Sequence, residues 1–126
     1  MPAYLLLKTF HLVGVFLAII GVAGLATHAA NGGRKSENAV YGLLSGLHGV
    51  GLLLVILCGG GMLMQVMRTP GIPSPAWIAA KLVIWTLFAF AAVVPYRWPR
   101  LARGMLVAGL PVLGALAAVV AVLKPF

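Results

Sequence analysis

Long apolar stretches separated by short polar segments make up most of the chain. Four stretches are nearly free of charge, and each is close to the roughly 20 residues that cross the hydrocarbon core of a bilayer. They run over about 3–29, 40–67, 76–96 and 104–123. None of them alternates apolar and polar residues as the strands of a transmembrane barrel do. The pattern therefore predicts four membrane-spanning helices within one integral membrane domain, residues 1–126.

The polar segments between the stretches are short, which restricts the topology. Residues 31–38 begin with Asn-Gly-Gly and offer several N-capping residues for the second helix. Residues 68–75 are rich in proline, and Ser74 with Pro75 resembles a helix cap followed by a first-turn proline. Residues 97–103 form a short basic turn. Loops this short make consecutive helices antiparallel neighbours, so we expect an all-α, up-down-up-down four-helix transmembrane bundle.

The composition supports a membrane protein. Apolar residues make up 63% of the chain and charged residues 8%, against about a quarter in soluble domains. The mean hydropathy is +1.12. These values exclude a soluble globular enzyme, a disordered tail and a disulfide-stapled secreted domain. The first stretch, residues 3–30, is too long for the apolar core of a signal peptide, so we interpret it as a retained helix.

The charge distribution predicts an orientation. Nine Lys and Arg residues stand against one acid, and they lie at the ends of the apolar stretches, where they anchor helices. No basic run is long enough to follow a phosphate backbone, so the expected partner is the lipid bilayer and not nucleic acid. The N-terminal side carries Lys8, Arg68 and Lys124, and the opposite side carries Arg34, Lys35, Arg97, Arg100 and Arg103. This bias predicts that both termini lie on the non-cytoplasmic side, with the bacterial inner membrane as the location.

Small residues are abundant inside the predicted helices. The chain holds 16 glycines, and in lipid such residues allow close helix packing. Gly42 and Gly46 form a small-xxx-small pair, although glycines can also make room for a flat cofactor ring. Cys58 is interpreted as a small apolar residue in a helix interface. The triple glycine at 59–61 and Pro111 are candidate helix kinks.

Ionisable residues inside a membrane span are functional candidates. A rise of about 1.5 Å per residue places five side chains in one layer below the N-terminal surface. These are Lys8, His11, Met62, Gln65 and Lys81. The only acid, Glu37, lies in a loop on the opposite side. We therefore expect Lys81 either to snorkel to the headgroups or to bind a backbone carbonyl, a lipid phosphate, another subunit or a ligand carboxylate.

The three histidines lie at different depths. His48 is about seven residues in from the opposite surface by the same count, level with Gly21, and His28 lies at that surface. The mismatch argues against a haem held by two histidines of one chain. Ligation by one histidine stays open, as does a hydrogen-bonding role for each. A single acid excludes a carboxylate pair, and no acid is placed to orient a histidine in a serine triad.

Two short segments resemble known proteins. Leu7-Lys8-Thr9-Phe10-His11-Leu12-Val13-Gly14 and Trp77-Ile78-Ala79-Ala80-Lys81-Leu82 are similar to the first and third helices of a group of small four-helix bacterial membrane proteins. The group is broad and includes the HemJ-type protoporphyrinogen oxidases, the SirB-like invasion regulators and the CopD copper-resistance domains. In HemJ-type enzymes a first-helix histidine binds haem and a third-helix lysine is needed for activity, which implies His11 and Lys81. Their aromatic and arginine-bearing stretch after the histidine is replaced here by residues 19–23.

Two function classes follow, and the sequence does not decide whether the chain is an enzyme. The first is a redox-linked membrane protein that binds haem b or a related tetrapyrrole. His11 would ligate the iron, Lys81 would hold a carboxylate, and His48 is a further cofactor-binding candidate. The second is an accessory subunit without a cofactor, packed by its glycine faces in a larger membrane complex or homo-oligomer. CopD-type copper transport and a pore are weaker alternatives, the latter because few polar residues lie on the helix faces.

Overall fold

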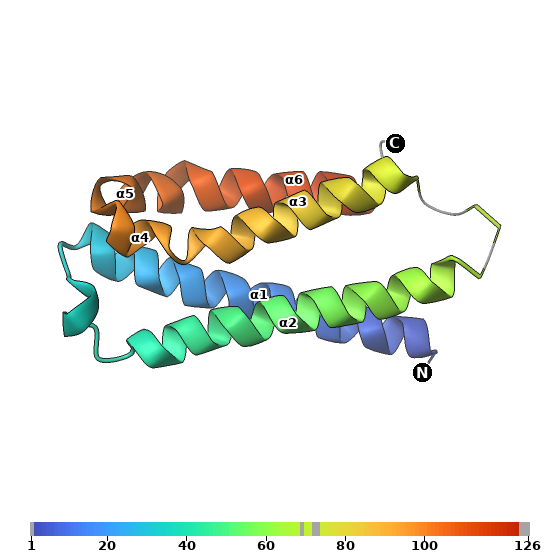
Figure 1. Ribbon diagram of the computed structural model, residues 1–126, viewed down its shortest axis with the longest axis horizontal. Helices are drawn as coiled ribbons and strands as arrows, with labels where there is room; N and C mark the ends of the chain where they lie inside the picture. The colour runs from blue at the N-terminus through green and yellow to red at the C-terminus, as the bar shows by residue number, and fades with distance from the viewer. Residues whose placement is uncertain (1, 69, 72–73, 124–126) are drawn as a thin grey trace.

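The computed structural model describes residues 2–68, 70–71 and 74–123. These residues form helices, with no strand among them. Four main helices alternate in direction along the chain (Figure 1): α1 (Ala3–Ala30), α2 (Tyr41–Val66), α3 (Pro75–Ala91) and α6 (Leu110–Val122). The expected all-α, up-down-up-down order is confirmed. Lys124, which contributed to the predicted charge bias, lies outside the described residues.

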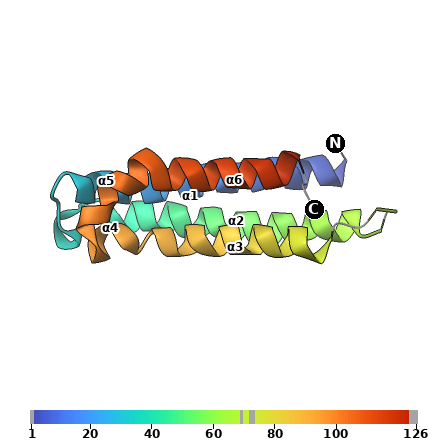
Figure 2. The ribbon, with the colours of Figure 1, turned by 90° about the horizontal axis from the view of Figure 1, so that it is seen from above.

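Figure 2 shows α1 and α6 in one layer and α2 and α3 in the other. Three helical segments are long and apolar enough to cross a membrane, judged by length and composition: Ala3–Ala30, Tyr41–Val66 and Pro99–Val122. Helix α3 is also apolar but has only 17 residues. It therefore extends over about 25 Å, somewhat less than a hydrocarbon core.

The predicted third span, 76–96, is wrong at its C-terminal end. Helix α3 stops at Ala91, and a separate short helix, α4 (Val94–Arg97), follows after two residues. Pro95 occupies the first turn of α4. Proline has no backbone N–H and clashes with the preceding helical turn, so an unbroken helix through this position is disfavoured. The break turns the chain across the end of the bundle.

The predicted fourth span, 104–123, is also not a single regular helix. It consists of α5 (Ala102–Gly104), a π-helical turn over Met105–Gly109, and α6. Pro111 is in the first turn of α6. It cannot donate a hydrogen bond to the turn before it, which is where the wider π-helical turn lies. By contrast, α2 continues as one α-helix through the candidate kink at residues 59–61.

The 31–40 loop ends α1 and leads into α2. Two residues after α1 ends at Ala30, Gly32 has a φ of +83°, and the N–H groups of Gly32 and Gly33 donate to the carbonyls of Ala29 and His28, each at 3.0 Å. This is the Schellman arrangement that glycine favours. The expected side-chain cap on α2 is absent, because the N-cap position is Val40.

At the start of α3 the prediction is confirmed. The Ser74 hydroxyl oxygen accepts a hydrogen bond from the Trp77 N–H at 3.2 Å, and Pro75 is the first helical residue.

The most deeply buried side chains lie toward one end of the bundle. Val22, Leu25 and Pro95 are fully buried. They come from the C-terminal half of α1 and from α4, which crosses the bundle at that end. The buried side chains of Ala26, Ala29 and Ala102 belong to the same region. The core is therefore concentrated at the end that holds the 31–40 and 92–101 connections.

Helices α1 and α2 pack through residues that repeat along the chain. Six residues of α1 each correspond to a residue of α2 that lies 37 positions later in the chain. The pairs are Leu7 and Leu44, His11 and His48, Gly14 and Gly51, Ala18 and Val55, Gly21 and Cys58, and Gly24 and Gly61. The repeat relates two antiparallel helices, so it corresponds to a pseudo-twofold axis perpendicular to them.

The contacts across this axis are reciprocal. A Cβ added to Gly14 would lie 2.7 Å from the Gly51 carbonyl oxygen, and one added to Gly51 would lie 2.5 Å from the Gly14 carbonyl oxygen. Likewise, Gly24 faces the Leu44 side chain and Gly61 faces the Leu7 side chain. Glycine therefore lets the two backbones approach closely.

The predicted packing pair, Gly42 and Gly46, is not part of this interface. An added Cβ at either position would meet nothing within 4 Å. Within the described residues this face of α2 is open, and the contact with α1 uses the face that carries Gly51 and Gly61. Cys58, in contrast, is buried as a small apolar residue would be.

Candidate functional site

His11 is held by the neighbouring helix. Its Nδ1 lies 2.9 Å from the carbonyl oxygen of Val55. A carbonyl oxygen can only accept, so Nδ1 carries the proton and Nε2 of the neutral ring keeps a lone pair. Gly59 lies beside the ring, where an added Cβ would be 3.3 Å from Cε1 of His11. The ring is half-buried, fixed in orientation, and flanked by a residue that has no side chain.

His48 makes the equivalent hydrogen bond from α2 to α1. Its Nδ1 donates to the Ala18 carbonyl oxygen at 2.9 Å, but the residue is only 4% exposed. Among the described residues, nothing hydrogen-bonds to its buried Nε2. A buried acceptor without a partner loses the hydrogen bonds that water would give it.

Lys81 is part of an aromatic stripe on α3. Its ammonium nitrogen lies 3.7 Å from the centre of the Trp77 ring, within the range of a cation–π contact. The indole N–H of Trp77 donates to the Val120 carbonyl at 2.7 Å, and that of Trp85 donates to the Leu52 carbonyl at 3.0 Å. The stripe therefore ties α3 to both α6 and α2, with Lys81 between the two tryptophans in sequence.

These contacts place His11 and Lys81 at a similar depth. Trp85 is level with Leu52, and one turn along the antiparallel helices brings Lys81 level with about residue 56. His11 is level with Val55. The predicted common layer is therefore supported for these two residues, although His11 lies about two turns deeper than Met62.

His11 and His48, the two histidines of the α1–α2 hairpin, are too far apart to share one metal ion. His11 is level with Val55, which is seven residues from His48 along α2. Seven residues correspond to an axial separation of about 10 Å. Two nitrogens on one iron are each about 2 Å from it, so both rings cannot ligate the same atom. This agrees with the expectation from sequence that no two histidines match in depth.

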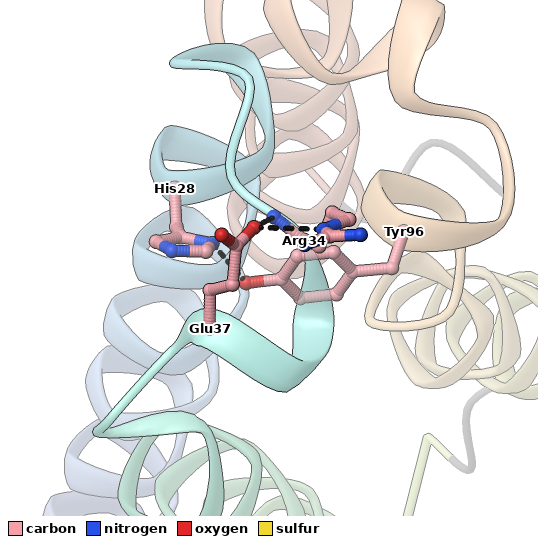
Figure 3. Close-up of polar contacts among 4 residues, drawn as sticks. All are labelled: His28, Arg34, Glu37 and Tyr96. Carbon is pink, nitrogen blue, oxygen red and sulfur yellow. Dashed lines mark hydrogen bonds and ion pairs between the residues drawn. The ribbon is translucent and has the colours of Figure 1, made fainter.

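His28 belongs to a polar cluster at the end of the bundle (Figure 3). The Tyr96 hydroxyl lies 2.7 Å from Nδ1 of His28 and accepts a hydrogen bond from the Asn38 amide at 2.8 Å. The cluster joins α1, the 31–40 loop and α4. Sequence analysis placed His28 at the surface but did not identify Tyr96, because only the break before α4 brings this tyrosine over the end of α1.

An exposed ion pair lies beside this cluster. The Nε of Arg34 is 3.1 Å from a carboxylate oxygen of Glu37, and the Arg34 backbone N–H donates to the same oxygen at 3.0 Å. The hydrogen bond from the Arg34 side chain is the main cause that lowers the pKa of Glu37 below its ordinary value. Figure 3 shows this pair next to Tyr96 and His28.

The described residues contain no group of three or more His, Cys, Asp or Glu side chains arranged to hold a metal ion. Any metal bound by this part of the chain would depend on fewer such ligands. Comparison with protein-family models, with curated proteins and with solved structures finds no match.

Proposed function

We propose that the chain is an integral membrane protein that binds haem b or a related tetrapyrrole through His11. The main support is the hydrogen bond from His11 Nδ1 to the Val55 carbonyl. Histidines that ligate metals usually donate their other ring N–H to a carbonyl or carboxylate, which fixes the tautomer and strengthens the ligating nitrogen. His11 therefore has the preparation expected of an axial ligand.

Two neighbours of His11 support the proposal. Gly59 leaves one flank of the ring without a side chain, and Lys81 lies at a similar depth on α3. In the proposal the ammonium of Lys81 binds a carboxylate of the tetrapyrrole, and Trp77 positions that ammonium by a cation–π contact. A bound haem would supply one-electron redox chemistry. The chain would hold the iron by one nitrogen and orient the macrocycle by one charge.

The proposal favours His11 over His48 as the ligand. His48 has the same hydrogen bond, but its burial between α1 and α2 leaves its Nε2 without access to a large planar group. In this assignment His48 is a helix-linking residue. The orientation with both termini outside the cytoplasm, in a bacterial inner membrane, belongs to the same proposal and follows from the basic residues at the opposite end.

The test is a visible spectrum of the full chain purified in mild detergent and titrated with haemin. We expect a stoichiometric Soret band and an α-band on reduction. His11→Ala should lose them, whereas His28→Ala, a matched histidine outside the proposed site, should keep them. Lys81→Gln should weaken haem binding about tenfold, the loss of about 1.4 kcal/mol expected for one charge-assisted contact.

The second function class, an accessory subunit without a cofactor, makes the opposite prediction. The His11 hydrogen bond would then serve only to link α1 and α2. No absorption band, or a band that survives His11→Ala, would overturn the haem proposal. Membrane proteins co-purifying in stoichiometric amount with a colourless chain would support the accessory role.

A further inference from the structure

A cationic cavity lies at the end of the bundle where α1 finishes, remote from His11. It has a volume of about 300 Å³. It is lined by Ala29, Gly32, Gly33, Arg34, Lys35, Tyr96 and Pro99. One wall is therefore the C-terminal end of α1 with its loop, and the other is the segment from α4 to the following turn. The lining combines two cationic side chains with apolar and aromatic surface.

The loop that lines this cavity packs on the His28 ring, which is hydrogen-bonded to Tyr96. An added side chain at Gly33 would collide with the His28 ring, which fills the space under the loop. That ring is fixed by Tyr96, and Tyr96 is fixed by Asn38. The backbone N–H groups of Gly32 and Gly33 are used to end α1, so they are not available to a ligand. Recognition in the cavity must therefore come from Arg34 and Lys35.

Both cations have only weak partners at present. Arg34 pairs with Glu37, but their side chains are 79% and 52% exposed. Exposed pairs of this kind contribute little to stability. The ammonium of Lys35 lies 4.7 Å from the centre of the Tyr41 ring, an exposed cation–π contact. A phosphate could therefore replace these contacts at small cost and gain charge-assisted hydrogen bonds.

The depth of the cavity indicates the source of the phosphate. It lies where apolar α1 ends and the polar loop begins, which is the level of the headgroups for a membrane-spanning α1. Arg97, Arg100 and Arg103 lie in the neighbouring segment and add positive charge at the same end. Basic pockets of membrane proteins at this level bind anionic lipid headgroups. We propose that this cavity binds the phosphate of an anionic phospholipid, independently of any tetrapyrrole.

The experiment measures lipid binding by the full chain in a non-ionic detergent. Native mass spectrometry would count bound phosphatidylglycerol and phosphatidylcholine across a titration, and melting temperature would give a second readout. We expect phosphatidylglycerol to bind about tenfold more tightly, the factor that corresponds to 1.4 kcal/mol. The double variant Arg34→Gln, Lys35→Gln should abolish this preference.

Two further variants separate a defined site from general attraction to positive charge. The double variant Arg100→Gln, Arg103→Gln removes the same charge from the same end but leaves the cavity lining intact, so the preference should survive. Glu37→Gln should tighten binding, because Arg34 then no longer has a competing carboxylate. Far-ultraviolet circular dichroism would verify that all variants stay helical.

Three results would overturn the proposal. Equal loss of preference in both double variants would indicate diffuse electrostatic attraction. Equal binding of phosphatidylcholine would show that the anionic headgroup is not recognised. Inorganic phosphate that displaces phosphatidylglycerol at similar concentration would assign the cavity to a free anion and not to a lipid.

Discussion

His11 and His48 occupy equivalent positions in the α1–α2 hairpin, but their surroundings differ. Each donates its Nδ1 proton to a carbonyl on the opposite helix, and the two distances are both 2.9 Å. His11 is half-buried, whereas His48 is 4% exposed. The residue beside His11 is Gly59, and the position equivalent to Gly59 in α1 is Val22, which is fully buried.

The comparison separates two properties of a candidate ligand. The hydrogen bond to the carbonyl prepares the ring nitrogen, and this step is the same at both positions. Access to that nitrogen differs, and the pair Gly59 and Val22 is the clearest difference in sequence at the two sites. A histidine whose Nδ1 donates to a carbonyl can therefore have a structural role or a ligand-binding role, and its nearest neighbours determine which.

The largest effect should come from breaking the packing on which both histidines depend. Gly51→Val would place a side chain against the Gly14 carbonyl, and we expect a loss of about 3 kcal/mol in unfolding free energy, at the upper end for overpacking. Unfolding in mixed detergent micelles would measure it. Gly42→Val, on the open face of the same helix, should cost far less, and equal losses would contradict the packing described above.

Removing each histidine in turn should sharpen the comparison. His48→Ala leaves a cavity in the interface and removes a buried hydrogen bond, so we expect a loss of about 2 kcal/mol. His11→Ala should cost about half as much, because its ring is only half-buried. Thermal unfolding of both variants without cofactor measures the difference. A larger loss for His11 would reverse the assignment of structural and binding roles.

Substituting the residue beside His11 and its equivalent in α1 should change how accessible each histidine ring is. Gly59→Val crowds the His11 ring and should lower haem affinity by about tenfold, or 1.4 kcal/mol. Val22→Gly should make His48 reactive toward diethyl pyrocarbonate, which acylates accessible neutral imidazole. Mass spectrometry after brief labelling would detect the change. Unaltered labelling of His48 would show that another side chain shields it.

The smallest effect should come from the loop, outside the hairpin interface. The Arg34 side chain lowers the pKa of Glu37, so the pair stabilises the fold above the ordinary value of about 4.5. That contribution is lost as pH falls through the lowered pKa. Because the Arg34–Glu37 pair is exposed, we expect only a slight fall in melting temperature, absent in Arg34→Gln. A large acid transition in that variant would locate the sensitive group elsewhere.

The apolar pattern predicted much of the fold, because long uncharged stretches and short loops leave few arrangements. It also placed His11 and Lys81 at similar depth, since helical rise converts residue number into distance. The pattern could not show which of the many glycines face a partner helix: Gly14 and Gly51 make the contact between α1 and α2, whereas Gly42 does not. Hydropathy also does not register the break before Pro95, where the chain remains apolar but the helix cannot continue.

The pseudo-twofold axis of the hairpin has a consequence for sidedness. An axis perpendicular to two spanning helices lies in the plane of the membrane, so the hairpin presents nearly the same pattern to both leaflets. The packing of α1 on α2 alone therefore does not favour ligand binding at one leaflet over the other. The preference must come from positions where the repeat is imperfect, such as Lys8 opposite Ser45 and Gly59 opposite Val22. A few substitutions on a near-symmetric scaffold are then enough to give the two faces of a membrane different chemistry.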